Sequence, residues 1–523
     1  MKSTRRIKKL NGIEYWFEET PYYDTEKKQI RHKSKYLGRN IDGHPVRMRT
    51  ASDEVKNAIK AIPGIKSSYE CGSITLLDSI MKDLKLDRYL QDLVTESELM
   101  QIKALVFNRI IRPVAMKNIG TWYEGTALVL QNPPISFSGQ RISELLAKLG
   151  DSNIPGTFMG KILAGLGTKS TLVYDITSLS SYSELINLLE YGYNRDGEPL
   201  PQLNFSLIVD QTLGIPVMYD IYPGSIVDVS TLSGTLKKIK AYGVHKFTAI
   251  MDRGFFSRGN LEELLDQNIS FILPATLNLK DLKILMSESQ RDIDDMKYLQ
   301  KFKKESIHAK KIEFSFNSHS VNGYLYYDPV LEQREKATFR SRIFDVREKL
   351  IETHIPRYRK AAEVFKEKAR DLEHYFSWVQ NDDRFEIEIR QNAVAQAMNK
   401  MGKYILFYSG DFDWITCLSM YRERDVVEKG FRTLKTDIGT LPLNTHNDRT
   451  TRGFLFISFM SLIIRSRLLK KMKETGLLKR YSIHHLILEL EKFRKVKLAN
   501  GEIAMTEMTK KQREIFDALG LCA

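Results

Sequence analysis

Cysteine is scarce in this 523-residue chain, which contains only three. They are Cys71, Cys417 and Cys522, far apart in the sequence and without a C-x-x-C pair. This excludes a disulfide-stapled scaffold and a cysteine-based zinc site, and it is typical of a reducing compartment. The ten histidines form no H-x-x-x-H pair or comparable set, so histidine-bound zinc is not expected either.

Long hydrophobic runs are also missing. The longest strongly apolar stretch covers residues 453–464 and is bracketed by Arg452 and Arg465. A helix that crosses a bilayer needs about 20 apolar residues, so no membrane span is predicted. Residues 1–10 are basic and lead into no apolar stretch, so no signal peptide is expected. Together with the cysteine usage, these absences predict a cytoplasmic protein without a membrane partner.

Acidic residues are outnumbered, with 65 Asp and Glu against 80 Lys and Arg, which gives a net charge of +15. Such a balance favours a polyanionic partner, either nucleic acid or an anionic membrane surface. Because nothing else supports membrane binding, nucleic acid is the favoured partner. Hydrophobic residues make up 42% of the chain, enough for real cores, which excludes a mainly disordered protein.

The first 50 residues predict a basic, β-rich N-terminal arm. Residues 1–40 hold eleven Lys and Arg against five acids. Aromatic residues with β propensity are interleaved with them: Tyr15, Trp16, Phe17, Tyr22, Tyr23 and Tyr36. Two interpretations stay open, a DNA-contacting arm and a small solvated β element.

Helical periodicity dominates residues 51–168. Apolar residues recur at helical spacing in 73–93, 98–111 and 141–150, and Gly150 is a suitable helix stop. This region is predicted to be a compact helical DNA-binding domain. Residues 476–523 are predicted to form a helical C-terminal region.

The pattern changes to alternating strands and helices after residue 168. Strands are predicted at 170–175, 204–210, 215–222, 246–252 and 269–275, with helices at 227–240 and 260–267. This order is the layout of a ribonuclease-H-like sheet. The predicted fold is therefore α/β, with a mixed five-stranded sheet and helices, preceded by the helical N-terminal domain.

A long insertion interrupts the predicted catalytic core. Its first part covers 169–275, the insertion 276–400, and the second part 401–475, where a strand returns at 403–409. Residues 334–370 contain twelve Lys and Arg against six acids. This segment is either a solvated helical hairpin or a basic wall over a DNA groove.

Two predicted neighbouring strands end in an acid, Asp175 and Asp252. Carboxylates side by side at such ends can share Mg²⁺, and two such ions can clamp a phosphodiester for in-line attack. An aspartate at a strand end is also a common turn residue. Asp210 and Asp220 lie at similar positions, and spacing alone does not exclude them.

A third acid comes from the helical stretch predicted over residues 414–435. Tyr421, Arg424, Glu428 and Lys435 are 3, 4 and 7 residues apart. On a helix they fall within about 60° of one another, which puts a phenol, a guanidinium, a carboxylate and an ammonium on one face. That face suits a phosphodiester, although a solvated helix with i,i+4 ion pairs has similar residues. Gly430 fits neither interpretation well.

These four residues match the Y-(2)-R-(3)-E-(6)-K signature, and the chain thereby resembles the IS4-type DDE transposases of bacterial insertion sequences. The sequences DRGF at 252–255 and YDITS at 174–178 resemble the blocks around the two aspartates of that family. The resemblance covers about residues 169–470 and includes the long insertion. Residues 33–43 are most similar to the IS1634 branch.

The resemblance implies a metal-dependent transposase that binds terminal inverted repeats, cleaves DNA and transfers a strand. Asp175, Asp252 and Glu428 carry over as the catalytic ligands of two Mg²⁺ ions, for which Mn²⁺ can substitute. Tyr421, Arg424 and Lys435 carry over as contacts to DNA phosphates. The implied partners are double-stranded DNA and a second copy of the chain, as a homodimer in a synaptic complex. The implied location is the bacterial cytoplasm, at the nucleoid when bound to DNA.

Two further residues are candidate DNA contacts, Arg253 and Trp378. Arg253 lies beside the second aspartate and can reach the DNA backbone. Trp378 lies in the insertion, where related enzymes stack an extruded base on an aromatic ring, or it anchors the insertion's own core. Asp228 is interpreted as a helix-start residue. The alternative functions are a ribonuclease-H-like nuclease without strand transfer and a catalytically inactive DNA-binding derivative.

Overall fold

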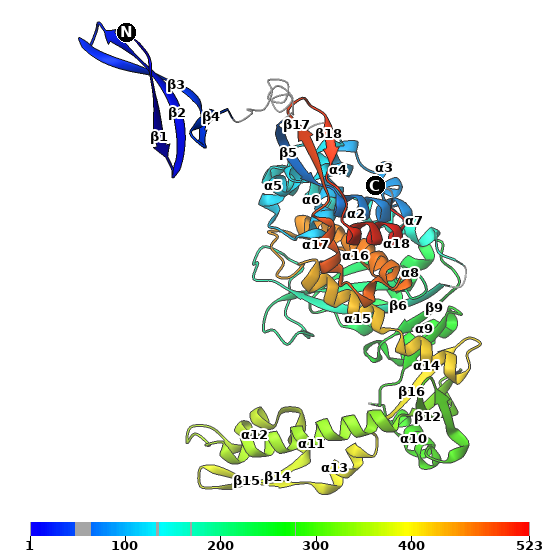
Figure 1. Ribbon diagram of the computed structural model, residues 1–523. Helices are drawn as coiled ribbons and strands as arrows, with labels where there is room; N and C mark the ends of the chain where they lie inside the picture. Colours follow the sequence, from blue (N-terminus) through cyan, green and yellow to red (C-terminus); the bar gives the residue numbers. More distant parts are fainter. Residues whose placement is uncertain (1, 48–63, 132–134, 168–169, 278, 522–523) are drawn as a thin grey trace. The chain divides into compact units, whose positions relative to one another are not determined.

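The computed structural model describes residues 2–47, 64–131, 135–167, 170–277 and 279–521, and divides into two compact units (Figure 1). The first unit comprises Met1–Ser68 with Lys495–Thr506, and the second comprises Tyr69–Arg494 with Glu507–Ala523. The predicted boundaries at residues 50/51 and 168/169, like Cys522, lie outside the described residues.

The first unit is made of antiparallel strands. Strands β1 (Thr4–Leu10), β2 (Ile13–Asp24), β3 (Gln29–Ile41) and β4 (His44–Val46) pair in sequence order. Asn11-Gly12 and Asp42-Gly43 have positive φ angles, as the tight two-residue turns of such hairpins require. Strands therefore occupy the arm, in line with its aromatic and basic alternation.

A second small sheet combines a strand that follows the N-terminal sheet in the sequence with two strands near the C-terminus. Its order is β18 (Ile503–Met505), β17 (Arg494–Leu498), β5 (Ile65–Glu70). The predicted all-helical C-terminal region is thus wrong in part, because the turn at Gly501, with φ of 90°, folds residues 494–505 into a hairpin. Helix α17 (Ile483–Leu490) precedes this hairpin in the sequence, and helix α18 (Lys510–Leu519) follows it.

A nine-stranded mixed sheet forms the centre of the second unit. Its five predicted strands lie in the order β10 (Ser270–Pro274), β9 (Phe247–Met251), β6 (Ser170–Ser180), β7 (Gln202–Asp210), β8 (Ile215–Pro223). Strands β10, β9 and β6 are mutually parallel, and β6, β7 and β8 are antiparallel.

The predicted count of five strands is wrong because the insertion adds to the sheet. Strand β16 (Lys403–Ser409) pairs with β10, and β13 (His319–Tyr327) pairs with β16. Strands β12 (Glu305–Phe316) and β11 (Leu299–Phe302) follow outward. The edge of β16 would otherwise present unpaired backbone groups, so the first half of the insertion is a sheet extension.

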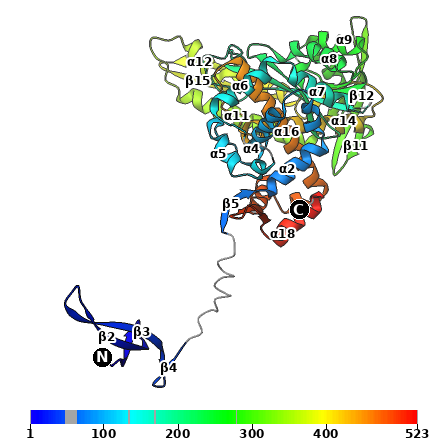
Figure 2. The same ribbon diagram turned by 90° about the horizontal axis from the view of Figure 1, so that it is seen from above.

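Helices pack around α16 (Asp448–Glu474), whose apolar stretch 453–464 is buried throughout. Figures 1 and 2 show α2 (Gly72–Asp83), α4 (Glu96–Ile111) and α6 (Gly139–Asp151) beside it. A Cβ at Gly453 would lie 2.0 Å from the backbone oxygen of Leu146, so α6 and α16 cross at backbone contact. Among the described residues, no helix is both long and apolar enough to cross a membrane.

The predicted separate helical domain is not observed. Helices α2, α4, α6, α3 (Leu86–Gln91), α5 (Ile119–Glu124) and α7 (Ile154–Ala164) contribute to one continuous hydrophobic core with α16 and the sheet. The physical reason is the amphipathic face of each helix, which is buried against α16 or its neighbours.

The second half of the insertion has its own core. Helices α11 (Pro329–Glu352), α12 (Ala361–Ala369) and α13 (Gln391–Met398) pack with the hairpin of β14 (Phe376–Asn381) and β15 (Arg384–Ile389). The ring of Trp378 lies 5.3 Å, between centroids, from both Phe365 and Phe385. Trp378 therefore contributes to this small core.

Candidate active site

Asp175 and Asp252 lie on adjacent parallel strands. The last register pair between β6 and β9 joins Tyr174 to Met251, and each aspartate is the next residue. Strand β6 does not end at Asp175 as predicted, because β7 pairs with it as far as Ser180. The parallel register therefore places the two aspartates at the same level, where β9 ends.

The environment of Asp175 disfavours an ionised carboxylate in the metal-free protein. Burial, together with the charge of Asp252, raises its pKa to about 7. The N–H of Ile176 donates to the Asp175 carboxylate at 2.8 Å, and the cations Arg195 and Arg424 also oppose the rise. A bound divalent cation would remove the penalty that Asp175 pays for its charge.

Substitution of Asp175 by Asn is expected to stabilise the metal-free protein at pH 8. The pKa of Asp175 is about 7 in the folded protein against 3.8 for the free group, so ionisation favours the unfolded state as pH rises from about 4 to 7. The stabilisation should be absent below pH 4 and reach at most about 4 kcal/mol above pH 7. Urea unfolding of both proteins in EDTA across this range measures it. A difference that does not change with pH would contradict the assignment, and Mn²⁺ should stabilise only the wild type.

The third acid, Glu428, lies on a helix that is shorter than predicted. The single helix expected over 414–435 is divided into α14 (Trp414–Arg422), α15 (Asp425–Arg432) and the π-helical turn η8 (Thr433–Asp437). Gly430 lies where α15 packs on β7, since a Cβ there would come within 3.3 Å of the Leu207 side chain. This close approach explains the glycine that neither sequence interpretation accounted for.

Arg424 contacts both an acid of the sheet and an acid of helix α15. Its Nη1 lies 2.9 Å from Oε1 of Glu428, and its Nη2 lies 3.4 Å from Oδ1 of Asp252. The guanidinium also lies 5.0 Å from the centre of the Tyr421 ring. Three of the four signature residues therefore meet at Arg424, which also contacts Asp252.

The acidic residues have the donor chemistry for Mg²⁺ but are not yet arranged as a cage. No group of three or more His, Cys, Asp or Glu side chains within the described ranges is close enough to hold a metal ion. The guanidinium of Arg424 separates Glu428 from Asp252. The three carboxylates fit a hard divalent cation, provided that Arg424 gives up its contacts to them.

Lys435 is held away from the acids by a residue that the sequence did not indicate. Its ammonium donates to Asp196 at 2.6 Å and is only 13% exposed. Asp196 lies in the long connection between β6 and β7, next to Arg195. No periodicity marks this connection, so no signal in the sequence pointed to either residue.

Arg195, which lies in the same connection between β6 and β7, contacts two other polar side chains. It forms an ion pair with Asp228, and its Nη1 donates to Oγ of Ser178 at 3.3 Å. Asp228 begins the short helix η3 (Asp228–Thr231), as predicted, but its side chain serves this ion pair. A Cβ at Gly254 would lie 3.3 Å from Oδ2 of Asp228, which brings the ion pair next to the segment that follows Asp252.

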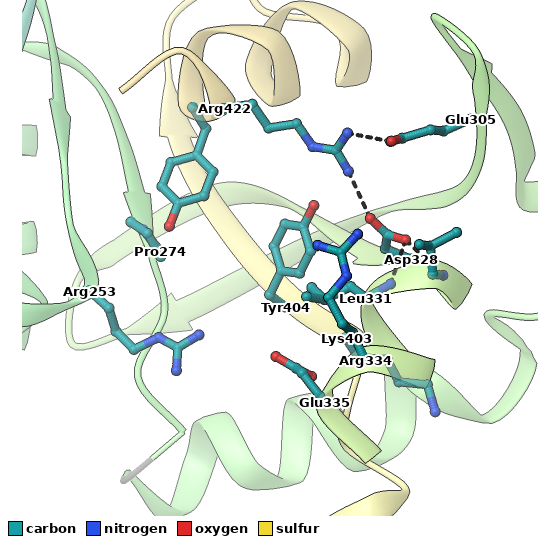
Figure 3. A pocket seen from close by; sticks show the side chains of 12 residues that line it. Arg253, Pro274, Glu305, Asp328, Leu331, Arg334, Glu335, Lys403, Tyr404 and Arg422 are labelled. Carbon is teal, nitrogen blue, oxygen red and sulfur yellow. Dashed lines mark hydrogen bonds and ion pairs between the residues drawn. The ribbon is translucent and has the colours of Figure 1, made fainter. Parts of the chain in front are cut away.

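A cavity of about 480 Å³ is lined by Arg253, the residue after Asp252 (Figure 3), and by Tyr421. Burial raises the pKa of the Tyr421 phenol. On the opposite wall Arg422 is fixed by Glu305 at 2.6 Å and Asp328 at 2.8 Å. Arg253 has no ion pair within the part of the chain that the structure describes, so its charge is available to an anionic ligand.

The competing aspartates and Trp378 lie outside this group. Asp210 accepts the N–H of Leu213 at 2.6 Å in the turn between β7 and β8. Asp220 forms an ion pair with Lys238 at 2.6 Å. Both therefore have structural roles, and Trp378 packs in the core of the insertion.

Comparison with known proteins gives one family and several remote structural likenesses, among them the following two. The piggyBac transposase synaptic complex with hairpin DNA is 10% identical, with a TM-score of 0.37, over 80% of this chain and 76% of that chain. The Drosophila P element transposase strand transfer complex is 13% identical, with a TM-score of 0.21, over 80% and 97%. No curated protein matches the sequence. The family described as Transposase DDE domain matches residues 167–464, more than half of the sequence and all three acids, so the chain belongs to the DDE transposase family.

Proposed function

We propose that this protein is an IS4-type transposase of a bacterial insertion sequence, of the IS1634 branch, which binds terminal inverted repeats, cleaves DNA there and joins the freed end to new DNA. The observation that carries the proposal is the meeting of Asp175 and Asp252 on adjacent strands, with Glu428 linked to Asp252 through Arg424. The family match over the same residues supports it.

Asp175, Asp252 and Glu428 would hold two Mg²⁺ ions, or Mn²⁺ in their place. The bound ions would supply charge neutralisation and an activated oxygen nucleophile. Arg424 then moves from the carboxylates to a DNA phosphate, for which its guanidinium is well suited. Arg253 and Tyr421 face the same cavity and contact the backbone beside the cut, and Lys435 does so after leaving Asp196.

The reaction is two phosphoryl transfers. In the first, the oxygen of water bonds to the phosphorus at the transposon end, and the bond to the 3′ oxygen breaks to leave a 3′-hydroxyl. In the second, that 3′-hydroxyl loses its proton and attacks a phosphorus of target DNA, whose own 3′ oxygen leaves. The protein contributes positioning and charge, with no covalent intermediate on the enzyme.

The proposed partners follow from this chemistry. Double-stranded DNA supplies both end and target, and two ends need two active sites, so a homodimer in a synaptic complex is proposed. The proposed place of action is the bacterial cytoplasm, on nucleoid DNA. The basic net charge of +15 supports a DNA partner.

A joining assay is expected to yield covalent product. A duplex with the sequence that borders the open reading frame and a free 3′-hydroxyl is incubated with supercoiled plasmid, protein and Mg²⁺. A labelled strand should become joined to plasmid, and the same duplex ending in a dideoxynucleotide should give none. Nicking of both duplexes without joining would favour the nuclease alternative, and binding without either reaction would favour an inactive derivative.

A further inference from the structure

The N-terminal sheet β1–β4 has two different faces, and the described residues 2–47 contain no helix that packs on either. Register pairs place Arg6 opposite Phe17, Phe17 opposite Tyr36, and Tyr15 opposite Arg39 on one face. The centroid of the Tyr36 ring lies 5.9 Å from that of Tyr15 and 5.6 Å from that of Phe17. We call this side the aromatic face; it comprises Arg6, Lys8, Tyr15, Phe17, Tyr36 and Arg39.

The other side, called the charged face, is balanced within itself. Glu18 lies between Arg5 and Lys35 in the register, and Lys9 lies opposite Glu14. Trp16 donates from its indole nitrogen to Asn40 at 2.9 Å, and Asn40 donates to Glu14 at 2.8 Å. The cations Arg5, Lys35 and Lys9 therefore lie opposite carboxylates on neighbouring strands, as is common on a solvated surface.

On the aromatic face, Arg6 and Arg39 have the rings of Phe17 and Tyr15 as register neighbours, and the carboxylate of Glu19 on the same face lies close enough to Arg6 for the charge of Arg6 to lower its pKa. Lys8 forms an ion pair with Glu19 at 2.6 Å and lies 5.4 Å from the centre of the Phe17 ring. Arg6 and Arg39 are exposed and have no ion pair among the residues described here. The face thus presents two free guanidinium groups around a cluster of three aromatic rings.

The aromatic face lacks cover within its own sheet. Every residue of β1–β4 except Glu19 and Gly38 is at least partly exposed. A sheet of three or more strands needs a hydrophobic face or packing against another element for its stability. Residues 1–47 hold twelve Lys and Arg against six acids, so the partner that complements this sheet is a polyanion.

The dimensions fit duplex DNA. The axes of the three long strands β1, β2 and β3 span about 10 Å, and the major groove is about 12 Å wide. Sheets that enter a groove contact phosphates with cations at their edges and bases or sugars with the side chains of one face. Arg6 lies on the edge strand β1 and Arg39 on β3, where it pairs with Val46 of the short strand β4; the rings of Tyr15 and Phe17 lie between them on β2.

We infer that β1–β4 is a DNA-reading sheet that lays its aromatic face into the major groove. This rests on the proposed function only in taking DNA as the substrate. It assigns DNA contact to one named face, and it makes no use of the acids or of a metal.

The test compares two double variants of the full chain that each remove two exposed cations. Arg6→Ala with Arg39→Ala alters the aromatic face, and Arg5→Ala with Lys35→Ala alters the charged face. Binding to the labelled end duplex is measured by fluorescence anisotropy in EDTA at several salt concentrations. The first pair is expected to weaken binding about 10-fold and to flatten the slope of log K against log salt by about 1.8. The second pair should change affinity less than 3-fold.

A second matched pair tests the rings. Tyr36 and Tyr22 are 44% and 45% exposed and belong to opposite faces, so Tyr36→Ala should weaken binding and Tyr22→Ala should not. Tyr36→Phe should keep both the fold and most of the affinity. Equal losses from both faces, or no loss from either double variant, would overturn the inference. So would a change of oligomeric state without DNA in the aromatic-face variants, which would assign the face to a second copy of the chain.

The outcome of this binding test is independent of the outcome of the joining assay. Binding in EDTA needs no catalysis, so a face-specific loss stands even where the joining assay gives no product. Joined product together with equal losses from the two faces would instead refute the reading sheet alone.

Discussion

Glu428→Gln is expected to lower the rate of Mg²⁺-dependent DNA cleavage by a factor of about 10³ or more while DNA affinity is retained. The amide has the shape of the carboxylate but lacks the negative charge that a hard divalent cation requires. Glu428 is exposed on one side of α15, and its hydrogen bond to Arg424 can be made by the amide oxygen. The substitution should therefore leave folding intact and act on the chemistry.

The matched control lies on the same helix. Asp425→Asn removes an equally exposed acid of α15 that forms an ion pair with Lys429 instead of facing Asp252. It should cleave within about 3-fold of the wild type, because surface ion pairs of this kind contribute little. Cleavage is measured as nicking of the end duplex, and affinity by anisotropy in EDTA. If Glu428→Gln cleaves at the wild-type rate, Glu428 is not a ligand of the catalytic ions.

The central sheet was predictable because its strands carry near-continuous apolar runs. Residues 204–210 and 246–251 are buried almost throughout, and burial on both faces leaves this signature in the sequence. The added strands β12 and β13 alternate polar and apolar residues, because one face of the sheet meets solvent there. Such a pattern predicts a strand but not its neighbour, so the sheet extension could not be foreseen.

The site was predictable where its geometry is local. Tyr421, Arg424 and Glu428 lie within eight residues, so they remain neighbours even though the predicted helix is divided into α14 and α15. Lys435 lies beyond the change to a π-helical turn, and its partner Asp196 comes from a connection more than 200 residues earlier. Contacts of that separation depend on tertiary packing, which neither periodicity nor motif spacing encodes.

Arg424→Ala is expected to raise the affinity of the DNA-free protein for Mn²⁺ about 10-fold, yet to reduce cleavage about 10²-fold or more. In the metal-free protein the guanidinium contacts Glu428 and Asp252, so it competes with a cation for both carboxylates. Its removal leaves two negative charges facing each other, and about 1.4 kcal/mol of relieved competition corresponds to the expected factor. Cleavage falls because the same guanidinium is the proposed phosphate contact.

The measurement is Mn²⁺ titration by electron paramagnetic resonance at pH 8. This pH lies above the pKa of about 7 that Asp175 has in the wild type, and removal of Arg424, one of the cations that lower this pKa, raises it. Lys429→Ala is the control, because it removes a cation from the same helix that pairs with Asp425. Arg424→Lys should keep weak metal binding and still lose cleavage, since an ammonium lacks the planar fork of the guanidinium. Unchanged or weaker Mn²⁺ binding in Arg424→Ala would show that the guanidinium supports the acidic site instead of competing for it, and the proposed transfer of Arg424 from carboxylates to DNA would then be wrong.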